Sequence, residues 1–188
     1  MLCDPSRQDL INTFALVAYI PDPLRKFLDD LRRELVPGCA PAAHVTILPP
    51  RPLSGTPQEA IDTIRARIPD FSPFEIETGE VVVFPISDVV YLSIEEGHKR
   101  LLQMHPALNL GPLKYQEPFP YHPHITLAQN LTHDQSIELA VLARRRWSEY
   151  TYSRVFPVES LAFVQNMVGN LWADLAHFQL DPAPSIRR

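Results

Sequence analysis

Two near-identical tetrads constrain the fold of this chain more than any other feature of its sequence. They are His44-Val45-Thr46-Ile47 and His124-Ile125-Thr126-Leu127. Residues i and i+2 of a β-strand point to the same face, so the histidine and threonine of each tetrad share one face. The aliphatic residues share the other. The sequence therefore predicts two strands, each anchored in a core and each presenting a polar pair on its opposite face.

Chance accounts poorly for this pair. The chain has 7 histidines and a hydrophobic content of 45%. A shuffled chain of this composition holds about 0.3 tetrads of the form His-x-Ser/Thr-hydrophobic. Two tetrads, each at the start of an expected strand, indicate a functional arrangement.

The hydrophobic pattern predicts a repeated order of elements. Apolar runs and alternation predict strands at 13–20, 44–48, 74–84, 89–94, 124–128, 155–163 and 171–180. Helical spacing and start signals predict helices at 24–35, 57–68, 98–104 and 132–147, with a proline-rich loop at 106–123. The order strand, helix, strand, helix, strands occurs twice along the chain. No glycine-rich turn follows any of the expected strands. We expect a duplicated α+β fold with mostly antiparallel sheets, as one domain over residues 1–188 and a monomer.

Composition narrows the function. The 188 residues carry a formal net charge of −5 and no long run of lysine or arginine. Coating of DNA or RNA depends on clustered cations, so we expect no DNA partner and, instead, a small nucleotide or RNA end in a local pocket. Two cysteines, Cys3 and Cys39, do not indicate a disulfide framework or a thiolate zinc site. No signal peptide or membrane span is indicated, which predicts a cytoplasmic protein without a membrane partner.

The paired tetrads suit the cleavage of a phosphodiester. One imidazole can remove a proton while the other delivers one, on opposite sides of the phosphorus. The hydroxyls of Thr46 and Thr126 can donate hydrogen bonds to non-bridging phosphate oxygens. We expect His44 and His124 to act together on one phosphate, with no metal and no cofactor.

The tetrads and the stretches around them, 43–53 and 123–128, resemble the 2H phosphoesterase superfamily. That superfamily includes 2′-5′ RNA ligase-like proteins and 2′,3′-cyclic nucleotide phosphodiesterases. The resemblance implies a bilobal α+β fold with pseudo-twofold symmetry and an active site in a central cleft. It also implies that His44, Thr46, His124 and Thr126 form the catalytic set, with His124 activating water and His44 protonating the leaving oxygen.

One departure from the family concerns charge. Many relatives carry a basic residue shortly after the second tetrad, whereas this chain has Ala128-Gln129-Asn130. Arg51 is the candidate for supplying the missing charge. Tyr121, in the loop before the second tetrad, is a candidate for stacking on a nucleobase, and packing within the loop is its alternative.

Other readings use the same residues. His122 and His124 could be two metal ligands, although no Asp, Glu or Cys sits nearby at chelating spacing. A histidine-triad nucleotide hydrolase is excluded because the third histidine is absent. A nucleotide-binding module without turnover and a 2′-5′ RNA ligase stay open as alternatives to hydrolysis.

Overall fold

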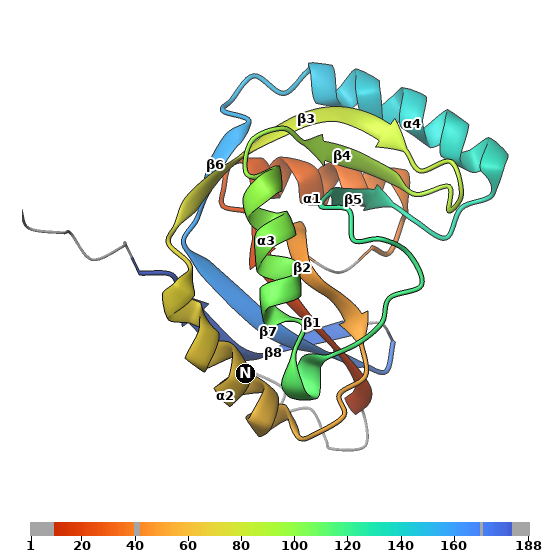
Figure 1. Cartoon of the computed structure of the whole chain (residues 1–188). Coiled ribbons are helices and arrows are strands. Elements are labelled where there is room, and N and C mark those ends of the chain that lie inside the picture. Colours follow the sequence, from red (N-terminus) through yellow and green to blue (C-terminus); the bar gives the residue numbers. More distant parts are fainter. Residues whose placement is uncertain (1–9, 40–41, 170, 182–188) are drawn as a thin grey trace, which may run out of the picture.

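Two four-stranded sheets and the helices around them make up the computed structural model, which describes residues 10–39, 42–169 and 171–181 (Figure 1). The strands are Leu10–Tyr19 (β1), His44–Arg51 (β2), Phe74–Val83 (β3), Val90–Ile94 (β4), Ile125–Ala128 (β5), Val155–Val158 (β6), Ser160–Met167 (β7) and Leu171–Gln179 (β8). The α-helices are Leu24–Leu35 (α1), Pro57–Arg67 (α2), His98–Leu108 (α3) and His133–Ser148 (α4). Short 3-10 turns at Ile68–Asp70 and Gly111–Leu113 complete the elements.

The two sheets exchange elements from the two halves of the chain. Their strand orders are β2-β1-β7-β8 and β5-β4-β3-β6, with every paired neighbour antiparallel. Strand β3 follows the first motif but lies in the second sheet, and β7 and β8 return to the first sheet. The helices cross in the same way, because α1 packs against β5 and α3 packs against β2. The expected α+β fold with antiparallel sheets is confirmed, but each sheet needs strands from both halves.

Local sequence signals explain the buried face of α1 and the starts of α2 and α4. Helix α1 buries the leucine face that its spacing predicts. Helices α2 and α4 each start with a reciprocal capping box, formed by Thr56 with Glu59 and by Thr132 with Gln135.

None of the helices within the described ranges is both long and apolar enough to cross a membrane.

Several expected boundaries are wrong; for example, β2 continues to Arg51, and β5 begins one residue after His124. Helix α3 continues to Leu108 through Pro106, because burial of Met104, His105 and Leu108 keeps its last turn packed against the protein. The expected strand at 155–163 is two strands, since β6 pairs with β3 in one sheet while β7 pairs with β1 in the other. The chain crosses between the sheets at Glu159, a change of partner that an apolar run does not reveal.

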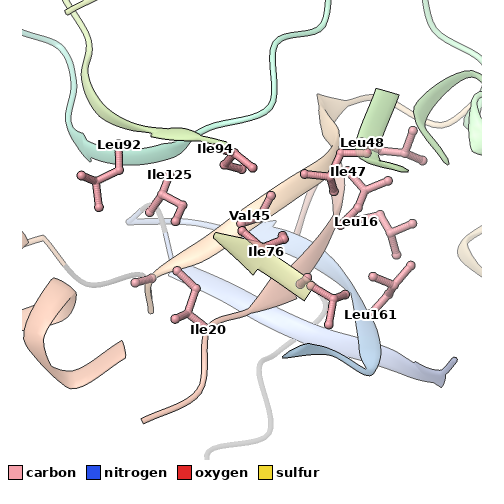
Figure 2. Close-up of a cluster of buried hydrophobic side chains, with 14 of the residues drawn as sticks. Leu16, Ile20, Val45, Ile47, Leu48, Ile76, Leu92, Ile94, Ile125 and Leu161 are labelled. Carbon is pink, nitrogen blue, oxygen red and sulfur yellow. The ribbon is translucent and has the colours of Figure 1, made fainter. Parts of the chain in front are cut away.

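One core serves both sheets. Figure 2 shows Leu16, Val45 and Ile47 of the first sheet beside side chains of the second sheet, Ile76, Leu92 and Ile125. The three aliphatic residues Val45, Ile47 and Ile125 are each 0% exposed. This is the anchoring that the alternation within the tetrads predicts. Because the sheets share their core, a shift of one sheet against the other requires repacking of the whole interior.

We expect Leu16→Ala to lower the free energy of unfolding by about 3 kcal/mol, because it opens a cavity at the centre of this core. Leu16 lies in the inner strand β1 and is 0% exposed. Chemical denaturation followed by tryptophan fluorescence measures the loss. Ile86→Ala, at a side chain that is 82% exposed, is the control and should change stability by less than about 0.5 kcal/mol. Equal effects in the two variants would contradict the assignment of the core.

Candidate active site

The two motif strands are edge strands that lie beside each other. Strand β2 is the edge strand of one sheet and β5 is the edge strand of the other. Cα atoms of the two strands approach within 8 Å of each other. Their neighbours on the core side are buried, whereas His44, Thr46, His124 and Thr126 are all half-buried. The structure therefore brings the four expected residues to one region, on the faces of β2 and β5 that point away from the core.

The two imidazoles are held in the same way. Nδ1 of His44 lies 2.7 Å from the carbonyl oxygen of Ala42. Nδ1 of His124 lies 2.7 Å from the carbonyl oxygen of His122. A carbonyl only accepts, so each Nδ1 must carry the hydrogen and each Nε2 is the acceptor when the ring is neutral. Both rings thus keep Nε2 for a ligand, and each can donate from it once protonated.

Both imidazoles have a lowered pKa. Burial is the largest cause at His44, and the nearby charges of Arg32 and His124 lower its pKa further, against the opposing effects of the Ala42 carbonyl and Asp29. Burial also lowers the pKa of His124, with a smaller contribution from His122. The effect of His124 on His44 shows that the two rings lie within electrostatic range of each other.

Aromatic side chains surround His124. Phe84 and Tyr91 stack on each other at 4.0 Å between ring centroids. Each also meets the His124 ring at a steep angle, at 5.1 and 5.3 Å. Tyr91 is the cross-strand partner of Thr126. These two aromatics restrict the orientation of His124, and no motif in the sequence marks them.

A cation that the sequence did not single out lies near the first motif. Arg32 of α1 is 7% exposed, and its charge acts on His44. It lies in α1, the helix that packs against β5. Arg32 therefore contributes positive potential at the first motif.

Arg51, the candidate for supplying the missing charge, is buried and makes contacts inside the protein. Its side chain is 1% exposed and pairs with the Glu117 carboxylate. The same guanidinium donates to Asn109 Oδ1 at 2.9 Å and to the carbonyl oxygens of Pro49 and Leu113 at 2.9 and 3.2 Å. These contacts tie β2 to the loop after α3. They occupy the guanidinium inside the protein, and a role of Arg51 in binding phosphate stays a prediction.

The Tyr121 side chain packs against the protein, and it lies close to the first motif. Its hydroxyl donates to the carbonyl oxygen of Thr46 at 2.7 Å. Its ring lies parallel to the His105 ring, with 4.1 Å between the centroids. One face of the Tyr121 ring is thus covered, as the loop-packing alternative predicts.

Across the described ranges, no group of three or more His, Cys, Asp or Glu side chains is arranged to hold a metal ion.

Comparison with known proteins now places the chain in a family. Residues 20–170 match the family model of the 2′-5′ RNA ligase superfamily, a stretch that includes both tetrads. This superfamily comprises the 2H phosphoesterases that the two tetrads resemble. The chain belongs to the 2′-5′ RNA ligase superfamily.

Curated relatives and solved structures agree with this assignment. A protein of Halalkalibacterium halodurans that is named as a phosphoesterase is 29% identical over 101 residues, which cover 49% of this chain and 58% of the relative. One of Oceanobacillus iheyensis with the same name is 31% identical over 81 residues, covering 43% and 47%. The chain thus spans about half the length of the curated relatives that it matches.

The solved structures show the fold. LigT of E. coli, crystallised with 3′-AMP, has a TM-score of 0.63 at 16% identity, over 90% of this chain and 98% of LigT. The Thermus thermophilus protein TT0787 has a TM-score of 0.56 at 19% identity, over 90% of this chain and 98% of that protein. The expected 2H phosphoesterase fold is confirmed.

We expect Arg51→Met to lower the free energy of unfolding by about 3 kcal/mol, because it removes the buried cation that pairs with the Glu117 carboxylate and leaves His105 as its partner. Arg65→Met is the control, since Arg65 pairs with Asp62 where both side chains are more than half exposed. Its loss should stay below about 1 kcal/mol. Thermal and chemical denaturation measure both. A stable Arg51→Met protein with weakened phosphate binding would show that this guanidinium serves the ligand instead.

Proposed function

We propose that the chain is a metal-independent phosphoesterase that hydrolyses a cyclic phosphodiester of the nucleoside 2′,3′-cyclic phosphate type, or a 2′-5′ linkage. One observation carries the proposal. Two imidazoles, one on the edge strand β2 and one directly before the edge strand β5, are fixed by the same Nδ1–H···O=C contact, and each keeps Nε2 for a ligand. E. coli LigT has been crystallised with 3′-AMP, NADP⁺ and ATP, which supports a nucleotide as the ligand.

Each residue of the four has a role in the proposed hydrolysis. Neutral His124 takes a proton from water through Nε2 as the water oxygen bonds to phosphorus. Protonated His44 gives its Nε2 proton to the ribose oxygen as the bond from phosphorus to that oxygen breaks. The hydroxyls of Thr46 and Thr126 donate to the non-bridging oxygens and stabilise their charge in the transition state.

The substrate itself contributes to the protonation of His44. Burial and Arg32 favour the neutral form of that ring in the free protein. A bound phosphate places negative charge beside the imidazole, and an opposite charge at that distance raises the pKa of a histidine. Binding of the phosphate thus supplies the condition under which His44 acts as an acid.

We expect kcat/KM to be highest below pH 6.5. The base acts only when neutral, so activity rises with pH through its pKa; the acid acts only when protonated, so activity falls through its own. Both values lie below the ordinary 6.5 in the free protein. Initial rates with a nucleoside 2′,3′-cyclic phosphate between about pH 4.5 and 8.5 test this. The profile of kcat should lie at higher pH than that of kcat/KM, and a kcat/KM maximum above pH 7 would contradict the assignment.

We expect His44→Ala and His124→Ala each to lower kcat/KM by about 10²-fold or more, because each removes a proton-transfer group. The four nucleoside 2′,3′-cyclic phosphates and a 2′-5′ dinucleotide are the substrates, and the assay contains a chelator. His133→Ala is the control, since His133 is exposed and pairs with Asp88. Loss of wild-type activity in chelator would refute the metal-independent scheme.

Two alternatives give different outcomes in the same assays. Thermal stabilisation by a nucleoside monophosphate without turnover of any substrate would identify a binding module. Joining of RNA ends carrying a 2′,3′-cyclic phosphate, without hydrolysis of the small cyclic nucleotides, would identify a ligase. The net charge of −5 favours a small substrate over a long RNA track.

A further inference from the structure

We propose that Tyr121 and His105 are positioning residues, which set the spacing and orientation of the two motifs by holding the backbone of β2 at Thr46 and Ile47. The inference rests on the proposed function, because it concerns the same site. Neither residue needs to touch the substrate in this role.

Strand β2 bulges next to the site. Leu16 pairs with Leu48 and Val17 pairs with Thr46, so Ile47 is an extra residue between two consecutive pairs. The extra residue of a bulge loses its regular ladder contacts, and the strand bends there. The bulge lies directly after the half-buried Thr46, so its geometry decides where His44 and Thr46 point.

Side chains from outside the sheet hold the two carbonyls at the bulge. The hydroxyl of Tyr121 donates to the Thr46 oxygen at 2.7 Å. Nδ1 of His105 lies 2.9 Å from the Ile47 oxygen. Their rings stack in parallel at 4.1 Å, so the two residues form one unit against the strand. We call this unit the carbonyl clamp.

The clamp connects the two motifs. Tyr121 lies three residues before His124, in the segment that leads into β5. Its hydrogen bond to Thr46 therefore joins the approach to the second motif to the backbone of the first. A change in this contact alters the separation of the two imidazoles, which must flank one phosphorus atom in the proposed reaction.

Buried charges anchor the clamp. Nε2 of His105 lies 3.0 Å from the Glu117 carboxylate, whose other oxygen pairs with Arg51. The His105 ring therefore lies between the Ile47 carbonyl and the Glu117 carboxylate. Arg51 is itself a residue of β2. The contacts thus leave β2 at Ile47 and return to it at Arg51, which fixes the loop to the strand.

The kinetic test is Tyr121→Phe, which removes the hydroxyl and keeps the ring on His105. We expect kcat to fall about tenfold with KM changed less than about twofold, because small misplacements of catalytic groups cost rate rather than binding. Tyr152→Phe is the matched control, since it removes a hydroxyl from a side chain that is 68% exposed. Its kcat should equal that of the wild type.

A parallel loss of kcat and thermal stability in Tyr121→Phe would mean general loosening and would overturn the inference, as would an unchanged kcat. His105→Gln, which keeps one donor, and His105→Leu, which keeps none, extend the test. We expect His105→Gln to retain more of kcat than His105→Leu. The reverse order would also overturn the inference.

A spectroscopic readout separates this inference from the proposed function. In ¹⁵N-histidine NMR spectra we expect shifts of the His44 and His124 ring signals in Tyr121→Phe but not in Tyr152→Phe. If the wild type turns over none of the substrates yet these shifts occur, the proposed hydrolysis fails and the positioning role stands. If the His44 and His124 signals do not move, the positioning role is overturned.

Discussion

The approach of two edge strands, β2 and β5, is the constraint on which this structure depends. Edge strands expose unpaired backbone groups and are usually shielded. Here the last strand of each sheet lies beside the last strand of the other. Strand β2 carries His44 and Thr46, and β5 carries Thr126 directly after His124. The approach therefore brings two distant parts of the chain to one region.

The interleaving of the halves makes this geometry stiff. Strand β3 completes the second sheet, β7 and β8 complete the first, and helices α1 and α3 each pack against the motif strand of the other half. The two sheets also share one core (Figure 2). A change in the separation of the imidazoles would disturb packing throughout the protein. Such rigidity suits a reaction whose rate depends on two groups being held in place.

The features that could be predicted from the sequence are those that depend on local hydrophobic periodicity. The alternation within each tetrad predicted buried Val45 and Ile47 beside half-buried His44 and Thr46, and the spacing in 24–35 predicted a helix with those bounds. The sequence could not predict the partners of Arg51 and Tyr121, because Glu117 and Thr46 lie 66 and 75 positions away along the chain. The bulge at Ile47 and the place of Arg32 near His44 also depend on tertiary contacts, which leave no local pattern.

The central claim is that the two imidazoles act on one phosphate. A crystal structure with inorganic phosphate tests it most directly. We expect one phosphate between β2 and β5, with Nε2 of His44 and of His124 each about 3 Å from one of its oxygens. The hydroxyls of both threonines should also contact this phosphate. A phosphate that touches only one of the two motifs, or that binds elsewhere, would contradict it.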